Sequence, residues 1–218
     1  MTSYILNTTA IQPLSKNKPQ QAIVLCHGYG GDGKDISMLA IGWQRFLPNA
    51  IFLCPDAPER CTINPKGFQW FDLESEEESI IFEKSLVAEE KLSKFLDQIL
   101  DNFQLKPINL AMVGFSQGCM MSIQVGLKKS KQINSLIGYS GKIINQTHLS
   151  KNINSRPKIF LMHGANDPIV PPMHLLESKE YLLNHKIKIK TKLFNNCEHR
   201  IPVEGSSLGL EFLKKNLL

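Results

Sequence analysis

A serine between two glycines is the first candidate for chemistry. The segment Gly114–Gly118 reads GFSQG, follows the apolar run 108–113 and precedes a helical pattern. A strand, a sharp turn and a helix in this order form the G-x-S-x-G elbow that exposes a nucleophilic serine. Side chains two residues from Ser116 would collide with the neighbouring strand or helix, which explains the glycines. The motif occurs by chance in roughly one chain in fifteen of this length, so a serine in an ordinary tight turn is the alternative.

A serine hydroxyl becomes a strong nucleophile only when a base takes its proton and a carboxylate orients that base. A predicted strand ends near Met162, and Asp167 lies on the loop that follows it. The last predicted strand ends near Phe194, and His199 lies on the next loop. The order serine, acid, histidine is the order found on the α/β-hydrolase fold. We therefore predict Ser116 as nucleophile, His199 as base and Asp167 as the orienting acid.

Other titratable residues compete for these roles. His163 lies on the same loop as Asp167, four residues before it, and is predicted to pack or hydrogen-bond structurally. His27 precedes the serine, contrary to the usual order, and Glu198 is an alternative acid on the less suitable loop. The HxxxH and HExxH spacings of metal sites are absent from the sequence, so no metal is expected. The remaining histidines are predicted to be surface residues: His148, His174 and His185.

Attack on a carbonyl creates a negatively charged oxygen that needs fixed hydrogen-bond donors. One donor is predicted to be the backbone N–H of Gln117, next to the nucleophile and at a helix start. The second is predicted to be the backbone N–H of Tyr29, in the glycine-rich run 28–33 after an early strand. The spacing of these glycines does not match the phosphate-binding motif G-x-x-x-x-G-K-[ST], so nucleotide binding has little support.

Short apolar runs alternate with longer helical patterns, which predicts a mostly parallel sheet with helices on both faces. The segment 57–71 has few helix or strand signals and is predicted to be a loop over the working edge of the sheet. The acidic stretch 74–78 suits the positive end of the helix that follows it. No linker divides residues 1–218, so a single domain is expected. The predicted strands are 22–26, 51–54, 108–113, 135–139, 158–162 and 187–194, and the predicted helices are 79–103, 117–129, 173–184 and 203–218.

Composition narrows the function classes further. The net charge of +5 is modest, and the basic residues show no aromatic-interleaved patch, which disfavours nucleic-acid binding. No apolar run is long enough to span a membrane, and the first residues do not resemble a signal peptide. The five cysteines form no CxxC pair and no zinc pattern. A reducing cytoplasm is therefore the expected location.

Several motifs read together resemble one family. They are LCHGYG (25–30), GFQWFD (67–72), GFSQG (114–118) and HGANDPIVP (163–171), with CPDAP (54–58) and HRIP (199–202) in addition. The set, spanning about residues 20 to 215, resembles the phospholipase/carboxylesterase family, which includes bacterial carboxylesterases and acyl-protein thioesterases. The resemblance implies an α/β-hydrolase fold with a minimal cap, the triad Ser116, Asp167 and His199, and an oxyanion hole from Tyr29 and Gln117. It also places Trp70 and Ile169 beside the acyl pocket, although ordinary core packing is an alternative for both.

The resemblance implies hydrolysis of carboxylic esters or thioesters without any cofactor. Lysophospholipids and acylated proteins are the alternative physiological substrates, and a homodimer is left open. The same triad also serves C–C and peptide-bond hydrolases, and a catalytically idle binding protein is the alternative from another class. The family often has leucine where Tyr29 stands and a small residue where Glu198 stands. These two departures leave the pocket shape and the pH optimum open.

Overall fold

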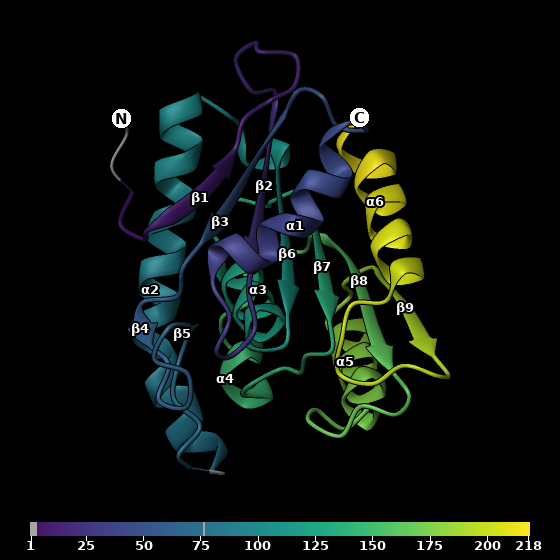
Figure 1. Ribbon diagram of the computed structural model, residues 1–218. Coiled ribbons are helices and arrows are strands. Elements are labelled where there is room, and N and C mark those ends of the chain that lie inside the picture. The colour runs from purple at the N-terminus through teal and green to yellow at the C-terminus, as the bar shows by residue number, and fades with distance from the viewer. Residues whose placement is uncertain (1–3, 76) are drawn as a thin grey trace.

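A seven-stranded sheet forms the centre of the computed structural model, which describes residues 4–75 and 77–218 (Figure 1). The strand order is β1-β3-β2-β6-β7-β8-β9, and only the edge strand β1 runs antiparallel to its neighbour. The predicted mostly parallel sheet is thus confirmed. The strands are β1 (Thr8–Ile11), β2 (Gln21–Cys26), β3 (Ala50–Pro55), β6 (Leu110–Phe115), β7 (Ser135–Tyr139), β8 (Lys158–Gly164) and β9 (Ile189–Phe194).

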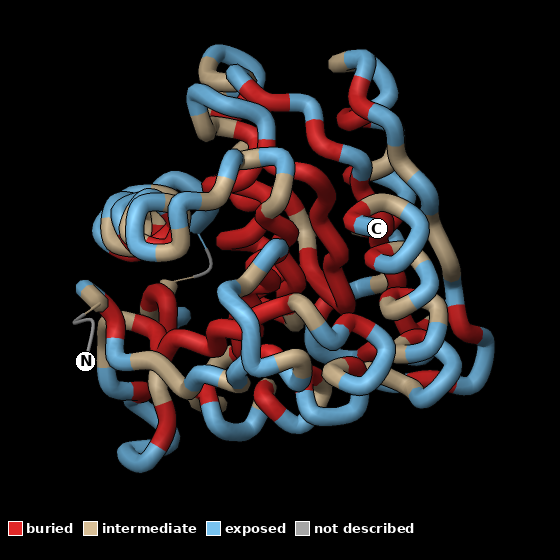
Figure 2. Tube along the Cα trace, turned by 90° about the horizontal axis from the view of Figure 1, so that it is seen from above, coloured by how far each residue is buried: buried red, intermediate tan, exposed pale blue. Residues whose placement is uncertain are grey.

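Helices cover both faces of the sheet (Figure 1). On one face lie α1 (Gly33–Gln44) and α6 (Val203–Leu217), and on the other lie α2 (Glu78–Phe103), α3 (Gln117–Lys128), α4 (Gln146–Ser150) and α5 (Met173–Asn184). Alternate residues of β2 enter the two layers: Ala22 and Val24 pack towards α2 and α3, whereas Ile23 and Leu25 pack towards α1 and α6. The buried residues therefore gather around the sheet between the helix layers, as Figure 2 shows.

The predicted elements are present, with shifted boundaries. The strand predicted from residue 108 begins at Leu110, because Pro107–Asn109 form a 3-10 helix. The last strand begins at Ile189 instead of residue 187, and β8 continues two residues further, to Gly164. Helix α2 begins at Glu78 with the acidic residue Glu77 as its N-cap, while Glu76 of the same acidic stretch lies outside the described residues.

Besides the 3-10 helix, four features were not predicted, and the first is the five-residue helix α4. Helix α1 begins after Asp32, whose side chain accepts a hydrogen bond from the N–H of Asp35 and so caps the helix. The edge strand β1 has four residues only. The loop predicted at 57–71 contains a short antiparallel pair, β4 (Glu59–Arg60) and β5 (Phe68–Gln69). Apart from α1, these elements have two to five residues, which carry too little periodicity to be recognised in a sequence.

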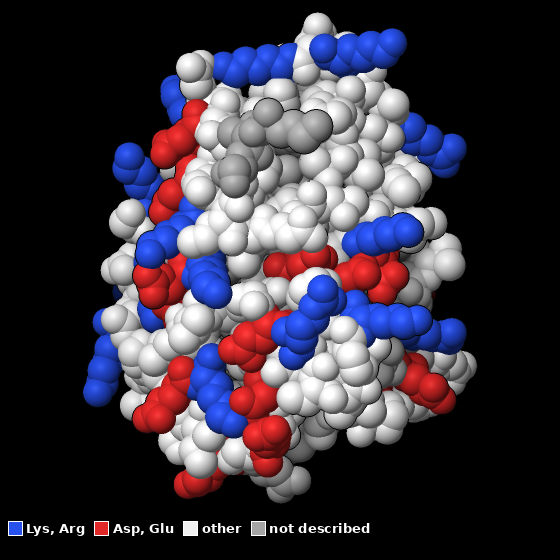
Figure 3. Space-filling model, turned by 60° about the vertical axis from the view of Figure 1, so that its left-hand side comes forward, with Lys and Arg blue, Asp and Glu red and all other residues white. Residues whose placement is uncertain are grey.

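The outer surface carries mixed charge over α2. Acidic and basic side chains are interspersed on this face (Figure 3), where ion pairs join Lys94 to Glu90 and Lys129 to Asp97. This face therefore has no continuous basic patch. Among the described helices, none combines the length and the apolar character that crossing a bilayer requires.

The parallel strands bring four loops to one edge of the sheet. Strands β2, β6, β8 and β9 all end there, since neighbouring parallel strands point the same way. The loops that follow them carry the residues singled out in the sequence: Tyr29, Ser116, Asp167 and His199. In open α/β sheets this edge is where ligands bind.

Candidate active site

Ser116 occupies a strained turn between β6 and α3. Its φ of 54° and ψ of −120° lie in a region that residues other than glycine rarely adopt. Its backbone N–H donates to the carbonyl of Tyr139 at 2.9 Å, which ties the turn to β7. A Cβ on Gly114 would lie 2.3 Å from the carbonyl oxygen of Gly118, and one on Gly118 would lie 2.1 Å from that of Cys26. The two glycines are therefore required for the close packing of strand, turn and helix.

The structure brings Ser116, His199 and Asp167 into one hydrogen-bonded series. The Nε2 atom of His199 lies 3.0 Å from the Oγ of Ser116, and its Nδ1 lies 2.7 Å from Oδ2 of Asp167. The serine and aspartate are buried, and the histidine is partly exposed between them. This arrangement allows the imidazole to take a proton from the hydroxyl while the carboxylate orients the ring.

Asp167 is held as a carboxylate by donors on its own loop. Burial raises the pKa of Asp167, but the N–H of Val170, the ring of His199 and the N–H of Ile169 outweigh it, so the pKa lies below its usual range. Both backbone donors lie 2.9 Å from Oδ1. The other oxygen, Oδ2, is left to face His199.

The rival residues occupy supporting positions. His163 is buried, its Nε2 donates to the carbonyl of Val170 at 2.9 Å, and the same atom lies 3.3 Å from Oδ2 of Asp167. Burial lowers the pKa of His163, which favours its neutral form. Glu198 is exposed, and Asp167 takes the Nδ1 side of His199 that an alternative acid would need.

His27 is buried under the loop that carries Tyr29. Its Nδ1 bonds the carbonyl of Gly28 at 2.7 Å, and its Nε2 accepts from the N–H of Ala57 at 3.0 Å. These two bonds require the neutral ring with the proton on Nδ1. Burial lowers the pKa of His27, in agreement with that protonation state. The ring thus stabilises the loop through its bonds to Gly28 and Ala57, and it is not among the residues hydrogen-bonded to Ser116, His199 or Asp167 in the described chain.

The two predicted oxyanion donors border the same cavity as Ser116. Tyr29 and Gln117 both line it. Within the described chain, neither backbone N–H donates to another group, so both are free to meet a substrate oxygen. Gln117 is the first residue of α3, where the helix end adds positive potential. The side chain of Tyr29 does not take part in this, since its hydroxyl bonds Oγ1 of Thr62 at 2.7 Å.

The cavity beside Ser116 has a volume of about 530 Å³ and a mainly apolar lining. Ile169 lines it and is 67% exposed, so it lies at the rim. The apolar lining also includes Phe71, Leu73, Ile81, Met120, Ile144 and Val170. Polar residues also line the cavity, among them Lys142 and His174. The sequence predicts a surface residue at His174 and does not place it at this cavity.

Trp70 does not line this cavity, contrary to the expectation from the family resemblance. Its side chain is fully buried, and its indole N–H donates to the carbonyl of His27 at 2.9 Å. Phe71 lies at the cavity wall in its place. Trp70 and Phe71 lie directly after the end of β5, and of the two only Phe71 lines the cavity.

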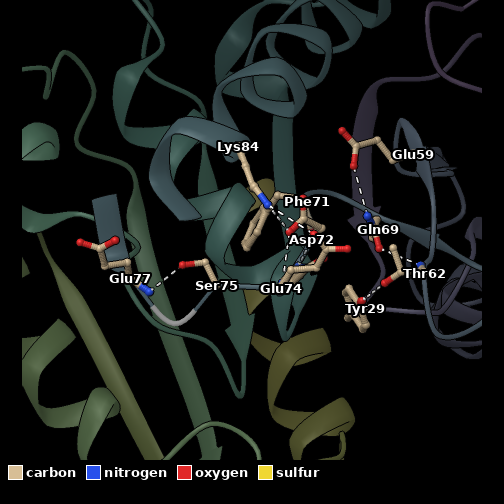
Figure 4. Close-up of polar contacts among 11 residues, drawn as sticks. Tyr29, Glu59, Thr62, Gln69, Phe71, Asp72, Glu74, Ser75, Glu77 and Lys84 are labelled. Atoms are coloured by element: carbon tan, nitrogen blue, oxygen red, sulfur yellow. Dashed lines mark hydrogen bonds and ion pairs between the residues drawn. The ribbon is translucent and has the colours of Figure 1, made fainter. Parts of the chain in front are cut away.

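The segment that runs from Gln69 to Asp72 is held by polar contacts near both of its ends (Figure 4). Towards α2, Asp72 pairs with Lys84, and this contact lowers the pKa of Asp72. Towards the Tyr29 loop, Gln69 accepts from the N–H of Thr62 at 3.1 Å and donates to Glu59 at 3.2 Å. Within the residues that the structure describes, no group of three or more metal-binding side chains is assembled.

Comparisons with known proteins show the family of this chain. The family model described as Phospholipase/Carboxylesterase matches residues 7–217. Acyl-protein thioesterase 1 of Schizosaccharomyces pombe is 27% identical, with 92% of each chain covered, and that of Saccharomyces cerevisiae is 29% identical, covering 91% of this chain and 93% of the relative. Among solved structures, that of esterase PE8 is 30% identical with a TM-score of 0.93, covering 97% of this chain and 99% of the other.

Proposed function

Because this chain belongs to the phospholipase/carboxylesterase family and is a hydrolase of ester bonds, we propose that it works through an acyl-enzyme on Ser116. In this mechanism Oγ of Ser116 attacks the carbonyl carbon while His199 takes the hydroxyl proton. The N–H groups of Tyr29 and Gln117 stabilise the oxyanion. His199 then gives the proton to the leaving alcohol or thiol, and a water molecule repeats the sequence to release the acid. Asp167 stabilises the imidazolium in both halves.

The observation that carries this proposal is the series of contacts from Ser116 through His199 to Asp167, at 3.0 and 2.7 Å. The strained φ of Ser116 supports it, since strain of this kind is kept where a reactive group must be exposed. Each contact is within the range expected of a nucleophile, its base and an orienting acid.

A fluorophosphonate probe with peptide mapping tests the proposal directly. The expected result is a single adduct on Ser116 that disappears in Ser116→Ala. The absence of an adduct in the folded wild-type protein would contradict the proposal and favour a catalytically idle binding protein. An adduct without turnover of esters, combined with cleavage of a peptide, would indicate a different hydrolase on the same fold.

For the substrate, we propose a carboxylic ester or thioester with an apolar acyl group. The apolar lining of the 530 Å³ cavity supports this class, because a cavity of this size buries a medium or long acyl chain. The relatives named acyl-protein thioesterase support an acylated protein as the physiological substrate. Rates on an S-acylated peptide, a lysophospholipid and a 4-nitrophenyl ester of the same acyl chain compare the three classes. A kcat/KM that is highest on the lysophospholipid would contradict the thioesterase role.

We also propose a cytoplasmic location. The five cysteines are all buried and unpaired in the described chain, which fits a reducing compartment. Fractionation of cells with markers for each compartment tests this location, and recovery with an extracellular or envelope marker would contradict it.

A further inference from the structure

Trp70 is hydrogen-bonded both to the loop that holds Tyr29 and to Gln117 at the start of α3, the two proposed oxyanion donors. It belongs to the short segment 68–71, which consists of β5 and the two residues after it. Trp70 is fully buried without lining the cavity. If Trp70 only filled space in the core, its N–H groups would need no particular hydrogen-bond partner. Here its backbone N–H bonds the side chain of Gln117, and its indole N–H bonds the carbonyl of His27, two residues before Tyr29.

On one side the segment is bonded to Gln117. The backbone N–H of Trp70 donates to Oε1 of Gln117 at 3.1 Å, and Nε2 of Gln117 donates to the carbonyl of Phe71 at 2.7 Å. Gln117 is 1% exposed, so both bonds are protected from water. These two bonds from one planar amide hold Gln117, the first residue of α3, in a fixed orientation relative to residues 70–71.

On the other side the segment is bonded to the loop of Tyr29. The indole N–H of Trp70 donates to the carbonyl of His27 at 2.9 Å, and the two rings lie 5.7 Å apart. Two further bonds join this loop to the segment 68–71. The N–H of Gly30 donates to the carbonyl of Phe68 at 2.9 Å, and the N–H of Phe68 donates to the carbonyl of Gly31 at 2.8 Å. The Tyr29 backbone is therefore bracketed by bonds to this segment on both of its sides.

We propose that Trp70 is a positioning residue for the oxyanion hole, which sets the separation of the N–H groups of Gln117 and Tyr29. This inference rests on the proposed acyl-enzyme function. Its physical basis is that oxyanion donors work only within a few tenths of an ångström of the position the oxygen will occupy. A misplacement of about 1 Å lowers rates by about 10²-fold. Trp70 does not line the cavity, and its hydrogen bonds reach the two donors through Gln117 and His27.

The variant Trp70→Phe tests the proposal, because it keeps an aromatic ring and removes the indole donor. We expect kcat on 4-nitrophenyl butyrate to fall by about tenfold or more, with KM changed less than about twofold. The chain offers a matched control in Trp43, which is also buried and whose indole N–H donates to Oγ of Ser206 at 3.1 Å. Trp43→Phe removes an equivalent bond between α1 and α6, away from the cavity lining, and is expected to leave kcat unchanged.

The inhibition constant of a transition-state analogue separates misplaced oxyanion donors from a general loss of stability. A trifluoromethyl ketone with a butyl chain accepts Oγ of Ser116 at its carbonyl carbon, the hydroxyl proton passes to His199, and the ketone oxygen becomes the bound oxyanion. We expect its Ki to rise about tenfold in Trp70→Phe and to stay unchanged in Trp43→Phe. If Trp70→Phe does not fold, Gln117→Met is used, because it removes both bonds to residues 70–71 and keeps the backbone N–H. The same rise in Ki and fall in kcat are expected.

Each result has one meaning. An unchanged kcat and Ki in a folded Trp70→Phe, or in a folded Gln117→Met, overturn the positioning role. An equal loss in Trp43→Phe also overturns it, since the effect would then come from general destabilisation. A wild-type protein without a fluorophosphonate adduct on Ser116 would instead mean that the proposed function itself has failed.

Discussion

The Nε2 atom of His199 lies 3.0 Å from the Oγ of Ser116, although 83 residues separate them in the chain. The contact exists because the two residues follow parallel strands, β9 and β6, whose carboxyl ends meet at one edge of the sheet. The strand order places β7 and β8 between them, so the loop after β9 must reach back across this edge to the elbow.

Ser116→Ala should fold like the wild-type protein and lose nearly all esterase turnover. The hydroxyl is the proposed nucleophile, and removing it leaves only the smaller acceleration from the oxyanion hole and substrate binding, so kcat should fall by about 10⁴-fold or more. Steady-state rates on 4-nitrophenyl butyrate, together with circular dichroism, measure both properties. Activity within tenfold of the wild-type value would contradict the role of Ser116.

Asp167→Asn should preserve the fold and lower kcat by about 10⁴-fold. The carbonyl oxygen of asparagine can still accept from the N–H groups of Ile169 and Val170, as Oδ1 of Asp167 does. Its amide nitrogen then faces Nδ1 of His199, which favours the wrong tautomer of the ring. Glu198→Gln is the matched control and should keep most of the turnover, since that residue is exposed. A greater loss in Glu198→Gln would mean that the alternative acid is the working one.

Gly118→Ala should destabilise the protein by about 2 kcal/mol or more, as overpacking of a rigid backbone contact does. The added Cβ would lie 2.1 Å from the carbonyl oxygen of Cys26, where no side chain can move aside. Gly42→Ala is the control in helix α1, because nothing lies within 4 Å of its added Cβ. That change should stabilise the protein by up to about 1 kcal/mol. Urea unfolding of both variants measures the difference, and equal stabilities would contradict the packing argument.

Ile169→Asn should reduce kcat/KM for octanoyl esters by about tenfold and leave acetyl esters nearly unchanged. Ile169 lines the rim of the cavity, so a polar group there removes apolar contact only with longer chains. Leu176→Asn is the control, because Leu176 is comparably exposed, at 61%, and does not line the cavity. A uniform loss over all chain lengths would contradict a role for Ile169 in binding the acyl chain.

Acid should destabilise the protein through its two buried histidines. Burial lowers the pKa of His27 and His163 below the ordinary value, so the unfolded chain binds their protons first as the pH falls. Their contribution is complete above pH about 6.5 and is lost as the pH falls from there towards the lower folded pKa, by up to about 1.4 kcal/mol per pH unit for each histidine.

Urea unfolding between pH 5 and 7.5 tests this pH dependence. His27→Gln should show a shallower slope of unfolding free energy against pH than the wild-type protein, whatever its absolute stability. An identical slope in His27→Gln would mean that His27 is not held neutral by its bonds to Gly28 and Ala57.

The sequence predicted the long elements well, because their signals are local. Helix α5 begins at Met173 and ends at Asn184, as its residue pattern predicts, and the six predicted strands lie within a few residues of their observed bounds. Helix α1 was missed although Asp32 and Asp35 provide a capping signal, since the glycines around it weaken the helical pattern. The four-residue strand β1 was also missed, because it is held at the edge of the sheet by its pairing with β3, which is a tertiary contact.

By itself the sequence determined which groups are available for chemistry and in what order: a serine in a glycine-bounded elbow, then an aspartate and a histidine after later strands. Spacing and order are properties of the chain, and the parallel-sheet pattern is enough to bring strand ends to one edge. Only the tertiary structure decided which loop side chains face the cavity. Trp70 is buried without lining the cavity and His174 lines it, because such placements depend on how separate loops pack together.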